Sequence, residues 1–208
     1  MYLYLDIETI PNPETDARLV SSVLDRTPEK KKPELIEKFS FMPMFNKIIC
    51  IGWGYEDEFE TFSLMNSNEA LLLKNFNEAL WTKGTDGHTV LVTWNGRSFD
   101  IPILRMKFAK HQISTPPFVW DEGRYTHDRQ IDLRDIVTNY DSYARGNLEE
   151  WAMFFGMFMD QQYKHDHPWT GRDILDLYND QQFEEISEKC KMDIRMTRYI
   201  HKQLSNVI

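Results

Sequence analysis

Two acidic residues near the N-terminus, Asp6 and Glu8, have the type and spacing of metal ligands. They belong to the stretch Leu3–Thr9, whose β-forming residues predict a short strand. Side chains two residues apart in a strand share one face, so the carboxylates would lie close together. In a buried strand this is costly unless a proton or a cation compensates, and hard divalent cations prefer oxygen ligands. An exposed edge strand with two solvated acids remains the alternative for this stretch alone.

Two acids further along the chain, Asp100 and Asp193, would complete such a site. Asp100 follows a strand predicted at His88–Trp94 and begins a helix, whose positive end favours a carboxylate. Asp193 lies inside a long helix predicted at Phe183–Leu204. Each also has a simpler explanation, because Asp100 suits any first helical turn and Asp193 fits a charged face with Lys189.

The hydrophobic pattern predicts one α/β domain over residues 1–208. The predicted strands are Leu3–Thr9, Lys47–Tyr55, Phe59–Leu64, His88–Trp94 and Ile131–Leu133. The predicted helices follow Asp100 or occupy Ala17–Arg26, Pro33–Phe39, Asn68–Trp81, Asn147–Phe155 and Phe183–Leu204. The first three strands would form an antiparallel meander, and the helix-rich second half would pack on the mixed sheet.

Composition is that of a globular protein, with 41% hydrophobic and 27% charged residues. No apolar run reaches membrane-spanning length and no signal-like segment begins the chain, so we expect a cytoplasmic protein without a membrane partner. The net charge of -9 argues against a generic nucleic-acid coat protein but permits an enzyme that gathers carboxylates around metals. Cys50 and Cys190 are expected to be free thiols.

Three segments carry the four acids, and their order along the chain is distinctive. They are DIET at Asp6–Thr9, NGRSFDIPIL at Asn95–Leu104 and CKMDIRMT at Cys190–Thr197. Together they resemble the three exonuclease motifs of the DEDD 3′-5′ exonucleases, and within that group the stand-alone predicted exonucleases related to the proofreading domain of family B DNA polymerases. Further similar segments are Pro43–Gly54, Ile131–Leu133, Asn147–Gly156 and Gly171–Ile174. The resemblance covers most of the chain and implies a ribonuclease H-like mixed β-sheet flanked by helices.

The resemblance also implies hydrolysis assisted by two metal ions. Two cations about 4 Å apart would clamp the scissile phosphate, activate a water and neutralise the leaving 3′ oxygen. Asp6 would bridge both ions, Glu8 and Asp193 would complete one of them, and Asp100 would act on the second through water. Mg²⁺ or Mn²⁺ suits ligands that are all oxygen atoms.

The implied partner is the 3′ end of single-stranded nucleic acid, with DNA favoured over RNA. By resemblance, Thr9 and Ile10 would border the terminal nucleotide, while Asn95 and Phe99 would hold the 3′ end. Arg97 would contact a phosphate or merely solvate a turn. The sequence does not identify a protein partner.

The chain departs from the family pattern just before its last acid. Polymerase-type relatives carry a tyrosine four residues before that aspartate, and the other large branch carries a histidine five before it, to orient or deprotonate the attacking water. Here these positions are Lys189 and Glu188. At ~100° per residue, position 189 lies about 40° from Asp193 around the helix and position 188 about 140°. We therefore expect a charged Lys189 that orients water or phosphate, with Glu188 as the alternative base.

Other residues admit competing interpretations. Lys189 favours an alternative function, a catalytically weakened nuclease fold that binds nucleic acid or acts as a scaffold, whereas the four acids favour the enzyme. His165, Asp166 and His167 fit no tetrahedral zinc site and predict a polar loop. Asp132 would end a strand, cap a helix or serve as an outer acid of the site.

Overall fold

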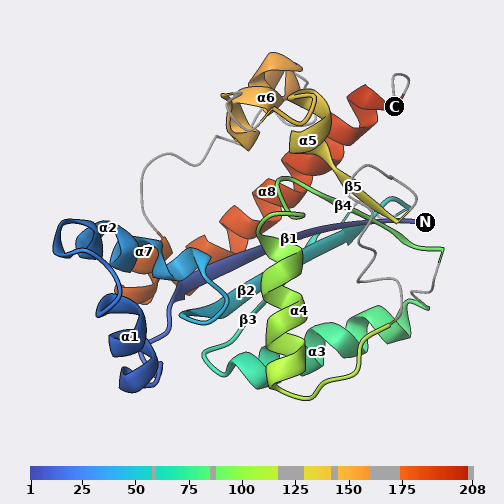
Figure 1. Cartoon of the computed structure of the whole chain (residues 1–208). Helices are drawn as coiled ribbons and strands as arrows, with labels where there is room; N and C mark the ends of the chain where they lie inside the picture. The colour runs from blue at the N-terminus through green and yellow to red at the C-terminus, as the bar shows by residue number, and fades with distance from the viewer. Residues whose placement is uncertain (58–59, 85–87, 117–128, 142–144, 160–173, 206–208) are drawn as a thin grey trace.

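A five-stranded mixed sheet forms the centre of the computed structural model, which describes residues 1–57, 60–84, 88–116, 129–141, 145–159 and 174–205. The strands are ordered β3-β2-β1-β4-β5 (Figure 1). Their bounds are β1 Tyr2–Pro11, β2 Asn46–Tyr55, β3 Phe62–Met65, β4 Val90–Thr93 and β5 Gln130–Asp132. Strands β1, β2 and β3 pair antiparallel, which confirms the meander, and β4 and β5 add in parallel to the other side of β1.

Strand β1 is the central strand, so the edge-strand alternative for Asp6 and Glu8 is wrong. Its alternate side chains enter different apolar clusters, with Leu3, Leu5 and Ile7 on one face and Tyr4 on the other. Strand pairing with β2 is interrupted by an irregularity between Glu8 and Thr9. This bulge follows the second acid directly and changes the register of the strand beyond it.

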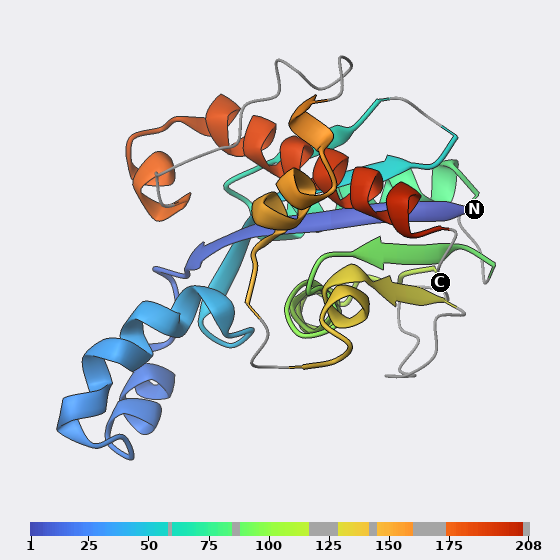
Figure 2. The same ribbon diagram turned by 90° about the horizontal axis from the view of Figure 1, so that it is seen from above.

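Helices cover both faces of the sheet (Figure 2). Helices α3 (Glu69–Thr82) and α4 (Asp100–Lys110) contribute to the apolar cluster on the face of Leu3 and Ile7. Helix α8 (Phe183–Leu204) crosses the opposite face with α6 (Leu148–Phe154) and α7 (Ile174–Asn179). The long C-terminal helix therefore has the predicted bounds and brings the third motif over the first.

Two glycines of β2 allow α8 to lie close to the sheet. Gly52 pairs with Asp6 in the register of β1 and β2. A Cβ atom at Gly52 would meet Cys190 Sγ at 2.6 Å, and one at Gly54 would meet the guanidinium of Arg198. Helix α8 thus packs directly against the glycine backbone of β2 beside Asp6.

Several element boundaries differ from the predicted ones. The segment between β1 and β2 forms α1 (Ala17–Leu24), a 3₁₀ turn at Glu29–Lys31, α2 (Lys32–Glu37) and a second 3₁₀ turn, η2 (Lys38–Phe41). The predicted helix Pro33–Phe39 was therefore wrong at its end, because the chain tightens into η2. In Figure 2 α1 and α2 stand away from the sheet.

The short strand near Ile131 is also shifted. β5 ends at Asp132, and Leu133 begins α5 (Leu133–Val137), because the Asp132 side chain accepts a hydrogen bond from Arg134 N and caps the helix. Within the described residues, no helix has the length and apolar character needed to cross a membrane.

Candidate active site

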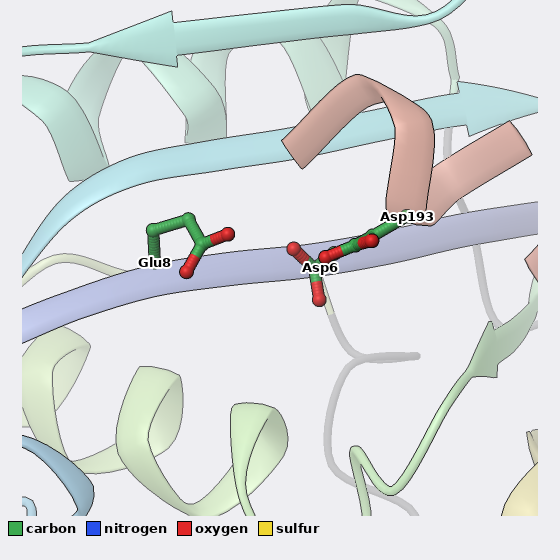
Figure 3. A group of neighbouring side chains, drawn as sticks. All are labelled: Asp6, Glu8 and Asp193. Carbon is green, nitrogen blue, oxygen red and sulfur yellow. The ribbon is translucent and has the colours of Figure 1, made fainter. Parts of the chain in front are cut away.

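Strand β1 and helix α8 bring three carboxylates together. Asp6, Glu8 and Asp193 each offer an oxygen within 4.8 Å of the others, and Figure 3 shows Asp193 reaching from α8 toward Asp6 on β1. The strand puts Asp6 and Glu8 on one face, as their spacing predicts. In the part of the chain that the structure describes, this is the single group of acid, histidine or cysteine side chains with the geometry of a metal site.

Asp100 lies beside this group and is held by the same strand. It is the first residue of α4, is only 2% exposed, and accepts a hydrogen bond from Ile7 N at 3.0 Å. Ile7 stands between Asp6 and Glu8, so the backbone of β1 fixes Asp100 next to both. The structure thus brings all four predicted acids to one region, with Asp100 outside the compact group of three.

The acids are poorly compensated by positive charge. Burial, followed by repulsion from Asp193, Asp100 and Glu8, raises the pKa of Asp6 well above its ordinary value. Burial raises the pKa of Asp100 to about 8 against the effect of its backbone hydrogen bonds. The pKa of Asp193 is also raised by burial, although Lys189 opposes this shift. Buried, mutually repelling oxygen donors fit a hard divalent cation, and Asp6, Glu8 and Asp193 would hold it.

Lys189 lies inside the carboxylate group, on the face of α8 that helix geometry predicts. Its Nζ donates to Glu8 Oε1 at 2.7 Å and to Asp193 Oδ2 at 3.0 Å. Burial alone would lower the pKa of Lys189, but Glu8, Asp193 and Asp6 outweigh it and raise that pKa above its ordinary value. Glu188 instead lies on the outer face, where it is 56% exposed and accepts from Lys191 Nζ at 2.7 Å.

Asp132 anchors the loop that carries the second motif. Its Oδ1 accepts from Asn95 N at 2.8 Å and its Oδ2 from Arg97 N at 3.0 Å. Asn95 has φ 61°, a left-handed conformation that asparagine tolerates. Asp132 therefore ends β5, caps α5 and orients the turn leading to Asp100. Its distance from Asn95 in sequence hid this role.

The predicted substrate-binding residues have different surroundings. Thr9 Oγ1 donates to Ser40 O at 2.6 Å, and the side chain of Ile10 is buried in an apolar cluster with residues of α7 and α8. The guanidinium of Arg97 contacts Gln130 O at 3.2 Å and Asp135 Oδ2 at 3.5 Å, which supports its role in the turn.

An aromatic residue that the sequence did not single out borders the site. Phe41, at the end of η2, is 62% exposed, and its ring lies 5.8 Å from that of Phe99. Phe99 directly precedes Asp100 and packs in part against the core. The aromatic and methionine-rich stretch at 39–45 is the one sequence feature that marks this surface.

The remaining sequence interpretations have simple outcomes. Cys50 and Cys190 are free and buried, as expected, and Cys190 Sγ lies 3.3 Å from Asp6 Oδ2. The run of residues 165–167 lies outside the described residues.

Residues 40–206 match the protein family described as "Predicted 3'-5' exonuclease related to the exonuclease domain of PolB". The chain belongs to this family. The matched range contains Asp100 and Asp193, whereas Asp6 and Glu8 precede it. Family and fold together support a nuclease of the 3′-5′ exonuclease type.

Solved structures show the same fold for this predicted exonuclease. The family B DNA polymerase of the hyperthermophilic archaeon Pyrobaculum calidifontis is 14% identical with a TM-score of 0.62, over 98% of this chain and 24% of the polymerase. Exonuclease I is 12% identical with a TM-score of 0.54, over 99% of this chain and 40% of its own. The chain thus spans less than half of either protein. These likenesses confirm the α/β, ribonuclease H-like fold. No curated protein matches the chain in sequence.

Proposed function

We propose that this protein is a divalent-metal-dependent 3′-5′ exonuclease that releases nucleotides from single-stranded 3′ ends, with DNA favoured over RNA. The observation that carries the proposal is the convergence of Asp6, Glu8 and Asp193 within 4.8 Å of one another on a central strand and a crossing helix. A merely structural core gains nothing from three closely spaced carboxylates that repel one another.

The carboxylates have distinct roles in this proposal. Asp6, Glu8 and Asp193 hold Mg²⁺ or Mn²⁺, and Asp100 supports a second ion. When bound, the ions supply charge neutralisation at the scissile phosphate and activation of the attacking water. Lys189 orients the water or a phosphate oxygen rather than removing a proton, since its charge is held by two carboxylates.

The surroundings of the acids support a terminal nucleotide as ligand. Thr9 and Ile10 come immediately after the bulge that follows Glu8, and Asn95 and Phe99 precede Asp100. The exposed ring of Phe41 adds an aromatic face on which a base can stack. The side chains of Thr9 and Ile10 are buried, so the groups that contact a base or sugar in this proposal are Asn95, Phe99 and Phe41. Binding would then depend on few phosphates and suit an acidic protein.

One assay tests the proposal directly. Labelled single-stranded oligonucleotides with a blocked 3′ or a blocked 5′ end are incubated with Mg²⁺, Mn²⁺ or a chelator, beside a circular single strand. We expect stepwise loss of mononucleotides that the 3′ block and the chelator prevent. Cutting of the circle as fast as the linear strand would indicate an endonuclease and contradict the proposal.

A second candidate, a catalytically weakened module that binds nucleic acid or acts as a scaffold, is favoured by one observation. Lys189 already pairs with two of the carboxylates that a metal would need. Binding of the oligonucleotides without any cleavage in Mg²⁺ or Mn²⁺ would select this candidate.

A further inference from the structure

Lys189 has an unusual position for a lysine, because it contacts two members of the carboxylate group at once. Its ammonium lies 2.7 Å from Glu8 Oε1 and 3.0 Å from Asp193 Oδ2. Glu8 comes from β1 and Asp193 from α8, so this single side chain connects the strand and the helix that build the site. The contact is largely shielded from solvent, since all three side chains are at most 23% exposed.

The next lysine of the same helix provides an internal contrast. Lys191 pairs with Glu188 at 2.7 Å on the outer face, and Glu188 is more than half exposed. Such an ion pair contributes little, because water and salt screen it. The Lys189 contacts instead lie where removal of one partner leaves buried charge uncompensated.

An ammonium and a divalent cation cannot both make full use of these oxygens. Glu8, Asp193 and Asp6 form the single group of the described residues with metal-site geometry, and Lys189 contacts the first two. A divalent ion placed among the three would meet a like charge at hydrogen-bond distance from its own ligands. When a metal ion binds, the ammonium must therefore either move away or stay and lower the affinity of the site for that ion.

We propose that the Lys189 ammonium is a tethered cation of the carboxylate site, which holds Glu8 and Asp193 together in the metal-free protein and competes with divalent metal for both. The inference rests on the proposed function only in taking this site as a metal site. In this view an incoming metal ion displaces the Lys189 ammonium from the carboxylates of Glu8 and Asp193. The protein thereby keeps its strand and helix in register before metal arrives, at the cost of weaker metal affinity.

The test is a direct measurement of Mn²⁺ binding, by titration calorimetry and by electron paramagnetic resonance of the free ion, with no substrate present. Lys189→Met removes the charge and keeps most of the volume. We expect it to bind Mn²⁺ about tenfold or more tightly than the wild type, within the usual range for two coupled ligands. Its melting temperature should fall in chelator and rise further on Mn²⁺ addition than that of the wild type.

Matched variants separate charge from shape and guard against loss of the fold. Lys191→Met, on the same helix, should bind Mn²⁺ as the wild type does. Lys189→Arg keeps the charge and should also bind Mn²⁺ weakly, whereas Lys189→Tyr, neutral and rigid, should bind tightly. Circular dichroism in chelator identifies any variant that has lost its fold, and the tyrosine variant then replaces the methionine one.

The outcomes distinguish this inference from the proposed function. Equal Mn²⁺ affinity in the wild type, Lys189→Met and Lys189→Tyr would show that Lys189 does not compete, and would overturn the inference while leaving the metal site intact. Absence of Mn²⁺ binding in all of them would overturn both. Tighter binding in Lys191→Met as well would point to a general effect of net charge and would also contradict the inference.

Discussion

The acids of the candidate active site and the buried acid Glu69 differ in how their charge is compensated. Glu69 at the start of α3 is only 7% exposed, yet its carboxylate accepts from Ile48 N at 2.8 Å and lies near three basic side chains. These are His111 at 2.9 Å, Lys107 at 3.3 Å and Lys110 at 3.8 Å. Burial raises the pKa of Glu69, but His111, Ile48 N–H and the two lysines outweigh it, and the net shift is downward.

The acids of the candidate active site show the opposite balance. The pKa values of Asp6, Asp100 and Asp193 are raised, and one lysine serves several carboxylates. Burial is similar in both regions, so depth alone does not identify a functional acid. The informative property is whether the protein itself supplies enough positive charge, because a deficit leaves the acids ready for an external cation.

The largest effect should come from removing an acid of the undercompensated group. Asp6→Ala should lower cleavage by at least about a thousandfold, because the residue is one of the three ligands of the proposed metal. The same change should raise the melting temperature of the metal-free protein, since repulsion is relieved. Cleavage at wild-type rate by Asp6→Ala would place the active site elsewhere. Asp193→Asn provides a second variant with the same expected loss of cleavage.

The pH dependence of stability should separate the two groups. The folded-state pKa of Asp100, about 8, exceeds its unfolded value, so the native state binds more protons and the unfolding free energy falls as pH rises from about 4 to about 8. Glu69 has the opposite sign, and its contribution is lost as pH falls through its lowered pKa. Thermal melts in chelator between pH 5 and 8 should show a decline that is shallower in Asp100→Asn. An unchanged slope in that variant would contradict the assignment.

Removing the compensated acid should damage stability and spare chemistry. Glu69→Gln leaves Lys107 buried without its carboxylate partner and should lower the free energy of unfolding by about 2 kcal/mol. Denaturant unfolding measures the loss, while metal-dependent cleavage below the melting temperature should stay near the wild-type rate. A stabilised Glu69→Gln protein would remove the contrast between the two groups.

If the acids of the candidate active site act on nucleic acid, the surface beside them should bind it. Phe41→Ala should weaken binding of a single-stranded oligonucleotide by about tenfold, the usual effect of losing one base-stacking ring. Phe154→Ala removes an aromatic ring that is 74% exposed on α6 and serves as the matched control. Fluorescence anisotropy in Ca²⁺, without turnover, measures both. Equal losses in the two variants would show that Phe41 has no special role.

The smallest effect is expected at Glu188, which belongs to neither group. Glu188→Gln should leave the cleavage rate within about twofold of wild type, because its carboxylate pairs with Lys191 on the outer face of α8. Single-turnover rates in Mg²⁺ test this expectation. A large loss of rate with Mn²⁺ affinity unchanged would identify Glu188 as the base.

Local periodicity was sufficient to predict much of this arrangement. The spacing of Asp6 and Glu8 gave their common face, and the turn of a helix gave the common face of Lys189 and Asp193. Each of these two predictions concerns residues of a single strand or a single helix, in which the period of the side chains is fixed.

Contacts between distant segments could not be predicted in the same way. Glu69 is a first-turn acid after the Asn68 cap, and nothing local in the sequence distinguishes it, because its partners Lys107 and His111 lie in α4 and at its C-cap. Arg97 and Asp135 also meet only through tertiary structure. Their pairing depends on how α4, α5 and β5 pack, which no local pattern specifies.

The absence of a side chain at Gly52 has a consequence for how such a site can be lost. Asp6 and Asp193 belong to separate elements, and the clearance between these elements beside Asp6 is set by a residue that has no Cβ. One added methyl group would meet Cys190 and lift the helix that carries Asp193, whereas at Gly54 the flexible end of Arg198 could yield. A related protein could therefore lose the activity of this site through a substitution at Gly52 while keeping all its acids. In comparing such proteins, this glycine is as informative as any carboxylate.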